Sequence, residues 1–288
     1  MKTKLVYVLI SSADDDQFAE MLALSLHTFR KHNHNAEVLV AMDEPTHLVL
    51  ERKRSSILEE ATPLVIDIPS EYNPMQRSRY IKTTLRKNIN GDFLYIDGDT
   101  FVVDKLDEID NTDAHIAMVA DLNCLGHFNP KAIAKCQTAG FFNLENEPYF
   151  NGGVMFVRDK PIAYEFFDKW HELWKKSISN GISVDQPGLC EANRVLGHPI
   201  KELPGIWNYQ YRCSRNNKYG VFIRNAKILH YYTVAKFGKV LTFLLNRVKN
   251  KGRVDTVVSL IIRNPYILVR SHKVSMFLSG LKNRNKKA

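Results

Sequence analysis

The sequence lacks any apolar run long enough to cross a membrane. No stretch reaches about 18 apolar residues without a charge, so we expect no membrane-spanning helix. The apolar segment at residues 5–10 has only six residues. It is too short for the core of a secretory signal, and its β-branched and aromatic residues are typical of a buried strand. We therefore predict that this segment is the first strand of a folded protein.

Cysteine is also scarce. The chain has four cysteines, and no two of them form a C-x-x-C pair. Such wide spacing predicts neither a zinc site nor a disulfide framework, and it suits a reducing cytoplasm. The four residues are Cys124, Cys136, Cys190 and Cys213.

What the sequence does contain is enough apolar residue to fold and an uneven distribution of charge. Of its 288 residues, 44% are hydrophobic and 25% are charged, which is typical of an ordinary globular protein. The net charge is +9, but residues 237–288 hold twelve Lys or Arg against one acidic residue and carry +11 by themselves. The remaining 236 residues therefore sum to −2. A slightly acidic body with a basic tail is not the even basic face of a general nucleic-acid binder, and we expect no nucleic-acid partner.

Short apolar, β-branched runs alternate with helical patterns, which indicates α/β layering. We predict strands at residues 5–10, 38–41, 64–68, 93–96, 115–120, 154–157 and 228–230. We predict helices at residues 18–32, 79–88, 163–176 and 186–196. The simplest division is one domain over residues 1–236 and a basic, amphipathic region over residues 237–288.

The strand predicted at residues 93–96 ends in two carboxylates, Asp97 and Asp99, on either side of Gly98. Ligands of open α/β sheets gather at the carboxyl ends of strands. Carboxylate oxygens suit Mg²⁺ or Mn²⁺, and the phosphates of a nucleotide can complete the coordination. The pattern alone is weak, because a second D-x-D occurs at residues 14–16 and an Asp-Gly turn after a strand is the ordinary alternative.

Three further segments supply context for these carboxylates. They are Y-F-N-G-G-V at 149–154, S-V-D-Q-P-G-L at 183–189 and H-Y-Y-T-V-A-K at 230–236. Together with residues 97–99 they resemble the GT-A fold glycosyltransferases, especially the retaining family that contains bacterial lipopolysaccharide galactosyltransferases and glycogenin. That family has Y-F-N-x-G-V, D-Q-x-x-L and H-x-x-G-x-x-K in the same order and with similar spacing.

The resemblance spans about residues 3 to 236. It implies a mixed, mostly parallel sheet flanked by helices, and the metal-dependent, retaining transfer of a hexose from a nucleotide sugar, with UDP favoured. Two departures stand out. Thr233 occupies the usual glycine position, and Phe237-Gly238 replaces the usual Pro-Trp. A β-branched residue hinders close backbone approach to a diphosphate, so the chain is expected to be a divergent relative.

The resemblance implies that His230 is a third metal ligand beside Asp97 and Asp99. A neutral imidazole would complete a set of two carboxylates and one histidine. Lys236 would neutralise phosphate charge. The alternatives are a structural histidine at a strand end and a solvated lysine.

The resemblance also places residues around the sugar. Asn151 would face sugar hydroxyls, and Asp185 and Gln186 would point at the sugar ring and stabilise an oxocarbenium-like transition state. The alternatives are a turn that precedes a buried strand for residues 151–153, and a helix N-cap for residues 185–186.

Other residues of the predicted donor site lie near strand ends or on a helix. Arg79 or Lys82 would reach the donor sugar and phosphates, although a solvated helix face is the alternative. Asp121 would accept a hydrogen bond from a sugar hydroxyl. Ser11 and Asp15 lie in a loop that resembles the uridine-recognition loop of the family, and they could equally cap the next helix.

The basic region at 237–288 alternates apolar runs with Lys and Arg, as expected of segments on an anionic membrane surface. A solvated or RNA-binding tail is the alternative. The sequence therefore predicts a cytoplasmic, peripheral enzyme on the inner face of the membrane, with a glycan or lipid-linked glycan as acceptor. A sugar nucleotidyltransferase is the runner-up, but that class needs a glycine-rich loop after the first strand, and residues 11–17 contain no glycine. A non-catalytic glycan- or RNA-binding protein is the other alternative.

Overall fold

A computed structural model describes residues 1–11, 17–123, 130–210, 225–231 and 238–264 of the chain. The strands are β1 (Lys4–Val8), β2 (Val38–Met42), β3 (Thr62–Val65), β4 (Phe93–Ile96), β5 (Thr100–Val102), β6 (Ile116–Ala120), β7 (Phe150–Val157), β8 (Ile200–Glu202), β9 (Tyr209–Gln210) and β10 (Ile228–His230). The helices are α1 (Phe18–His32), α2 (Glu44–Lys53), α3 (Ser55–Glu60), α4 (Pro74–Asn88), α5 (Pro130–Thr138), α6 (Pro161–Ser179), α7 (Gln186–Val195), α8 (Gly238–Lys251) and α9 (Thr256–Ile262). Short 3₁₀ helices lie at η1 (Asp107–Asn111), η2 (Asp121–Asn123) and η3 (Gly205–Asn208).

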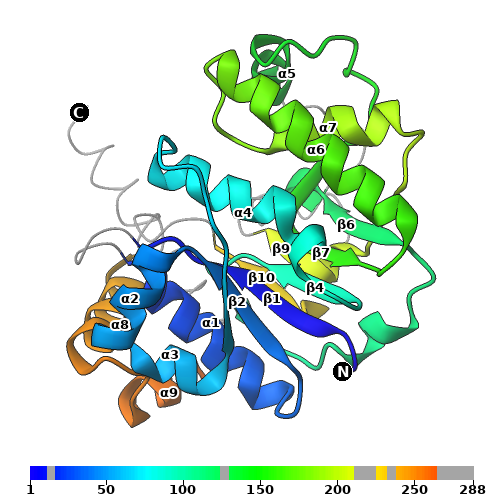
Figure 1. The fold of residues 1–288 in the computed structure, drawn as a ribbon. Coiled ribbons are helices and arrows are strands. Elements are labelled where there is room, and N and C mark those ends of the chain that lie inside the picture. Colours follow the sequence, from blue (N-terminus) through cyan, green and yellow to red (C-terminus); the bar gives the residue numbers. More distant parts are fainter. Residues whose placement is uncertain (12–16, 124–129, 211–224, 232–237, 265–288) are drawn as a thin grey trace, which may run out of the picture.

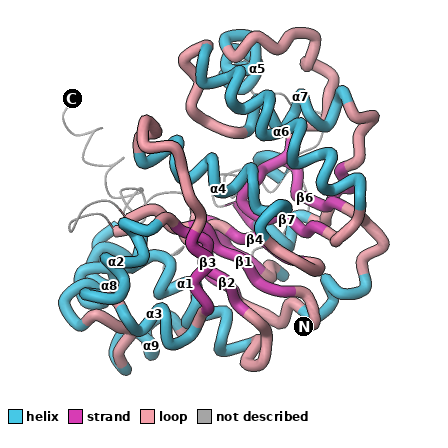
Figure 2. Tube along the Cα trace, viewed as in Figure 1, coloured by secondary structure: helices cyan, strands magenta, loops and turns pink. Residues whose placement is uncertain are grey.

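The main sheet has the strand order β3-β2-β1-β4-β7-β6-β8, and a small sheet has the order β5-β10-β9. In the main sheet the pairs β2–β3, β1–β2, β1–β4 and β6–β8 are parallel, and β7 is antiparallel to both β4 and β6. Helices lie on both sides of the strands (Figures 1 and 2). The predicted α/β architecture, with a mixed and mostly parallel sheet, is confirmed.

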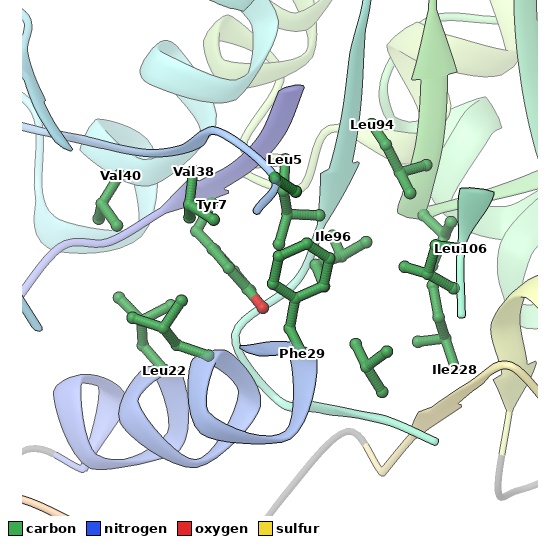
Figure 3. Close-up of a cluster of buried hydrophobic side chains, with 14 of the residues drawn as sticks. Leu5, Tyr7, Leu22, Phe29, Val38, Val40, Leu94, Ile96, Leu106 and Ile228 are labelled. Carbon is green, nitrogen blue, oxygen red and sulfur yellow. The ribbon is translucent and has the colours of Figure 1, made fainter. Parts of the chain in front are cut away.

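Successive residues of the central strands are buried on opposite faces of the sheet. Leu5 and Tyr7 of β1 pack toward Leu22 and Phe29 of α1 in one hydrophobic cluster (Figure 3). Val6, between them, belongs to a second cluster formed with residues of α4 and α6. Because both faces are covered, the strands read as continuous apolar runs, which is why the sequence predicts them well.

Helices α8 and α9 belong to the folded body. Leu241, Leu244 and Leu245 of α8 are buried in a third cluster with Met21 and Leu24 of α1. The same cluster includes residues of the small sheet and of α9. A shortened chain that ended near residue 236 would therefore expose an apolar face of α1 and of the small sheet.

Several element boundaries differ from the prediction. The strand predicted at 64–68 is β3, at Thr62–Val65. It can begin before Pro63, which has no N–H to donate, because β3 lies at the edge of the sheet. The helix predicted at 79–88 begins at Pro74, where Asn73 and Gln76 form a capping box. The first strand ends at Val8 instead of residue 10.

The strand predicted at 154–157 begins four residues earlier, at Phe150. Pairing with β6 extends it, since Ala120 lies opposite Phe150 and Val119 opposite Asn151. Residues 151–153 therefore lie within β7, and the interpretation of this segment as a turn before the strand was wrong.

Some segments were not predicted as secondary structure, namely β5, β8, β9, α2, α3, α5, α8 and α9. Among the described residues, no helix is both long enough and apolar enough to cross a membrane. Cys136 and Cys190 are buried free thiols, and Cys124 and Cys213 lie outside the described residues.

Candidate active site

Strand pairing brings His230 to the aspartates that follow β4. In the small sheet, His230 of β10 lies opposite Thr100 of β5, and the Tyr231 N–H donates to the carbonyl of Asp99 at 3.1 Å. The two segments are 131 residues apart in sequence. The end of β10 is thus fixed beside residues 97–99 by backbone hydrogen bonds.

Strand β7 supplies the floor of the same site. The Asp97 N–H donates to the Gly153 carbonyl at 2.9 Å, which continues the β4–β7 pairing. A Cβ added at Gly153 would lie 2.4 Å from His230 Cε1 and 2.8 Å from Asp97 Oδ2. Only glycine leaves room here for the imidazole and the carboxylate to approach each other, so the need for glycine is one of space.

We call Asp97, Asp99 and His230 the Asp–Asp–His triad. His230 Nε2 lies 3.1 Å from Asp99 Oδ1 and 3.7 Å from Asp97 Oδ2. One ligand atom from each residue lies within 4.8 Å of the others, so the three could together hold a metal ion. Two carboxylate oxygens and one imidazole nitrogen are a donor set that suits a divalent cation such as Mn²⁺. The residues present fit such an ion.

The pKa values of two triad residues, His230 and Asp97, are shifted from their ordinary values. Burial alone would lower the pKa of His230, but the carboxylates of Asp99 and Asp97 outweigh it and raise that pKa above its ordinary value. For Asp97, burial acts to raise the pKa of the carboxyl, and Lys82 and His230 more than compensate, so the pKa is lowered. The site thus favours a positive charge between its carboxylates.

Tyr95 and Lys82 hold the other oxygen of Asp97. The Tyr95 hydroxyl donates to Asp97 Oδ1, and Lys82 Nζ lies 3.6 Å from the same atom. Lys82 Nζ also sits 4.8 Å from the centre of the Tyr95 ring, a cation–π contact. With Oδ1 engaged in this way, Asp97 turns Oδ2 toward His230.

A second charged group lies beside the triad, and we call Arg79, Lys82 and Asp185 the α4 ion cluster. Lys82 Nζ lies 3.4 Å from Asp185 Oδ2, and Arg79 Nε lies 3.1 Å from Asp185 Oδ1. Arg79 and Lys82 are three residues apart on α4 and so share one face of that helix. Burial acts to raise the pKa of Asp185, and the two cations reverse the effect and lower it. Both of the alternative basic residues therefore reach the site, and neither lies on a purely solvated face.

Two tryptophans of α6 position the segment that carries Asp185. Trp170 Nε1 donates to the Asp185 carbonyl at 3.0 Å, and Trp174 Nε1 donates to the Ser183 carbonyl at 3.1 Å. Asp185 occupies the N-cap position of α7, but its side chain makes no capping hydrogen bond. The side chain pairs with Arg79 and Lys82 instead. The next residue, Gln186, donates from Nε2 to the Phe150 carbonyl at 3.3 Å.

Asn151 and Asp121 meet at the ends of β7 and β6. Asn151 Nδ2 donates to Asp121 Oδ1 at 3.0 Å, and Asn151 Oδ1 accepts from the Gly153 N–H at 2.9 Å. Asn151 Oδ1 also accepts from Asn208 Nδ2 at 2.9 Å, and Asn208 Oδ1 lies 3.1 Å from His230 Nδ1. A continuous chain of polar contacts thus connects Asp121 to the triad.

Not every predicted residue is brought into these contacts. Ser11 is buried next to the start of α2, where its N–H donates to Thr46 Oγ1 at 3.1 Å. Gly98 lies between the two aspartates, and a Cβ there would make only ordinary contact with Leu22, at 3.7 Å. Asp15 and Lys236 lie outside the described residues.

Two contributors were not identified from the sequence. Tyr95 had a signal, because residues i and i+2 of a strand project to the same face and Tyr95 precedes Asp97 by two. Asn208 had none, since it ends a short 3₁₀ helix outside any of the four motifs.

Comparison with known proteins identifies a family for this chain. The sequence profile of glycosyl transferase family 8 matches residues 16–238. No curated protein matches the chain at a significant level.

Solved structures share the fold at low sequence identity. The galactosyltransferase LgtC, in complex with donor and acceptor sugar analogues, has a TM-score of 0.58 and 16% identity, over 86% of this chain and 96% of its own. The glycosyltransferase GlyE of Streptococcus pneumoniae has a TM-score of 0.57 and 15% identity, over 87% of this chain and 64% of its own. Mouse xyloside xylosyltransferase 1 has a TM-score of 0.53 and 12% identity, over 81% and 98%. With a family profile that matches most of its length, the chain belongs to glycosyl transferase family 8 and is a glycosyltransferase of the GT-A fold, rather than a sugar nucleotidyltransferase or a non-catalytic binding protein.

Proposed function

We propose that this protein transfers a hexose from a UDP-sugar to a glycan or lipid-linked glycan acceptor, such as a surface polysaccharide or lipopolysaccharide intermediate, with Mn²⁺ or Mg²⁺ at the Asp–Asp–His triad. One observation carries the proposal: Asp97 and Asp99, which follow β4, and His230, from the distant strand β10, converge over Gly153, where a single added carbon would collide with His230 and Asp97. A bound divalent cation would offset the negative charge that develops on a departing diphosphate.

The α4 ion cluster supports a role next to the diphosphate and sugar. It contains two cations and one carboxylate, so it retains positive charge for an anionic ligand. In this proposal Arg79 and Lys82 attract the phosphates and orient Asp185, and Asp185 with Gln186 faces the sugar ring. The acceptor hydroxyl attacks the anomeric carbon as the bond to the diphosphate breaks, and the nucleoside diphosphate leaves and takes up the hydroxyl proton.

The remaining donor contacts extend from the same edge of the sheet. Asn151 and Asp121 hydrogen-bond to sugar hydroxyls, which need paired donors and acceptors at short range. Ser11 and Asp15 recognise the uridine, and Lys236 adds positive charge at the diphosphate. These three assignments rest on the motif resemblance.

We propose retention of the sugar's configuration, supported by the resemblance to retaining enzymes. The anomeric configuration of the product, read by NMR from the proton coupling at the new linkage, tests this directly. A product of inverted configuration would remove retention from the proposal and leave the transferase activity in place.

We also propose that the basic region at 237–288 rests on an anionic membrane surface, on the inner face of the cytoplasmic membrane, and brings the domain at 1–236 to a lipid-linked acceptor. Supporting this, α8 and α9 expose Phe243, Val257 and Leu260 on their outer side, among a local excess of Lys and Arg.

Flotation with vesicles tests the membrane proposal. The parent should float with vesicles rich in anionic lipid and remain behind with zwitterionic vesicles. The doubly substituted variant Phe243→Ser, Leu260→Ser should bind anionic vesicles less well, and equal flotation of both proteins would contradict the proposal. These substitutions are preferable to removal of residues 237–288, which would expose the core beneath α8.

The activity itself is tested with a panel of UDP-, GDP- and CMP-sugars, by measuring hydrolysis and transfer with and without Mn²⁺. We expect metal-dependent turnover of a UDP-sugar, reduced about 100- to 1,000-fold by Asp99→Ala. Asp113→Ala is the matched control, because Asp113 is an exposed carboxylate that forms a surface ion pair with the exposed Lys201. Absence of metal-dependent turnover or binding for every donor would refute the proposed function.

A further inference from the structure

Asn208 lies outside the four sequence motifs, yet its side chain contacts two residues of the site. The residue ends η3 and its side chain is completely buried. Its Nδ2 donates to Asn151 Oδ1 at 2.9 Å, and its Oδ1 lies 3.1 Å from His230 Nδ1. One amide therefore contacts both a proposed sugar-binding residue and a triad residue.

The orientation of the Asn151 amide is fixed from two sides. The Gly153 backbone N–H can only donate, and it meets Asn151 Oδ1 at 2.9 Å. The Asp121 carboxylate can only accept when ionised, and it meets Asn151 Nδ2 at 3.0 Å. If the amide were rotated by half a turn, Nδ2 would face the Gly153 N–H, donor against donor, and Oδ1 would face the Asp121 carboxylate, acceptor against acceptor. The observed orientation is therefore strongly preferred.

This orientation passes along the chain to His230. Because Asn151 presents its oxygen, Asn208 must present Nδ2 to it and therefore turns Oδ1 to the histidine. A carbonyl oxygen only accepts, so the hydrogen bond to His230 requires a proton on Nδ1. In a neutral imidazole the lone pair is then on Nε2, the atom nearest to Asp99 and Asp97.

We propose that Asn208 is a positioning residue, held by Asp121, Gly153 and Asn151, that fixes His230 with its proton on Nδ1 and directs the Nε2 lone pair to the cation position of the triad. The opposite tautomer would point an N–H at that position and exclude a cation. A hydrogen bond to the other ring nitrogen is how proteins commonly orient a metal-binding histidine. The inference depends on the proposed function only where metal affinity is concerned.

NMR of the ring nitrogens gives the first test. In protein labelled with ¹⁵N-histidine, His230 should show a slowly exchanging Nδ1–H, with and without Mg²⁺, and a nuclear Overhauser effect to the Asn208 side chain. His230→Gln identifies the signal by its loss. A His230 ring that is protonated on Nε2 and lacks the Nδ1 proton would overturn the proposal, whatever the metal affinity.

Titration with Mg²⁺ alone gives the second test. Asn208→Leu should lose the protected Nδ1–H and bind Mg²⁺ about 10- to 100-fold more weakly. Asn208→Asp gives up the donor to Asn151 Oδ1 but keeps an acceptor for Nδ1–H, and it should keep the protected Nδ1–H signal. Asn193→Leu is the matched control, since Asn193 is equally buried and bonds the Ile200 N–H away from the site.

The outcomes separate the inference from the proposed function. If the parent binds no Mg²⁺, the metal site fails and the NMR result still decides the proton position. If Asn208→Leu and Asn193→Leu unfold in urea at similar concentrations but only the former loses affinity, a merely structural role is ruled out. Equal Mg²⁺ affinity in the parent and in folded Asn208→Leu would refute the positioning role.

Discussion

The Asp–Asp–His triad and the α4 ion cluster lie side by side but balance their charge differently. In the α4 ion cluster, Arg79 and Lys82 surround Asp185 and neutralise it within the protein. In the triad, two carboxylates face one imidazole, and the raised pKa of His230, against the effect of burial, shows that the imidazole is drawn toward the charged state. The α4 ion cluster thus pairs its one carboxylate with two cations of the protein, whereas the triad has an excess of carboxylate and is arranged to gain a cation.

The largest effect is expected from removing one cation of the α4 ion cluster. Lys82→Met leaves Asp185 and Asp97 without the ammonium that lies within 3.6 Å of both. Because Lys82 is almost fully buried, the free energy of unfolding should fall by about 3–5 kcal/mol, as when one partner of a buried ion pair is removed. Urea unfolding measures the change.

Lys87→Met is the matched control on the same helix. Lys87 and its partner Asp168 are both exposed, so its loss should cost no more than about 1 kcal/mol. Losses of similar size for the two variants would show that Lys82 does not compensate buried charge.

A smaller effect is expected from crowding the Asp–Asp–His triad. Gly153→Ala places a carbon against His230 and Asp97 at distances that require them to move, whereas the Cβ of Gly152→Ala would lie 3.2 Å from Lys82 Nζ, the end of a flexible side chain. Gly153→Ala should lower Mn²⁺ affinity about 10-fold or more, and Gly152→Ala should leave it within about threefold. Calorimetric titration of both variants checks the difference, which would vanish if the triad were not the metal site.

The smallest effect concerns His171, a partly buried histidine with the opposite shift to His230. Its ring meets the Tyr80 ring edge-on and is tilted against the Trp174 ring, and its Nδ1 lies 2.8 Å from Thr83 Oγ1. Burial first, and then the positive charge of Lys175 and Lys87, lowers the pKa of His171 from 6.5 to about 4.

The sign of the resulting pH dependence follows from the lowered pKa. Between pH 6.5 and about pH 4 the unfolded chain binds a proton at this position and the folded chain does not. Stability contributed by the neutral ring is therefore present above pH 6.5 and is lost as the pH falls through this window. Urea unfolding of His171→Gln should show a shallower loss on acidification than the parent, and identical slopes would contradict the assignment.

The sequence predicted the parts of the fold and site that depend on local pattern. Buried strands such as β1 and β4 appear as continuous apolar runs, and Asp97 follows directly from its strand. His230 was predicted only because four motifs occurred together, since its contact with Asp99 depends on the pairing of β5 with β10. That pairing joins distant segments, and β5, with three residues, is too short to give a periodic signal.

Other features depend on packing that no local pattern encodes. The side chain of Asp185 turns away from its own helix because α4 places two cations beside it. Asn208 joins the site through the path of a short 3₁₀ helix between β8 and β9. Polar residues in such connections resemble surface loop residues in the sequence, and only the fold shows that Asn208 is buried.

The most direct test of the central claim is calorimetric titration of Mn²⁺ into the parent protein and into the near-isosteric variants Asp97→Asn, Asp99→Asn and His230→Gln. We predict one site in the parent and binding weakened about 100-fold or more in each variant, with parent-like binding in the exposed control Asp113→Asn. Parent-like affinity in all three triad variants would contradict the assignment of the metal site to Asp97, Asp99 and His230.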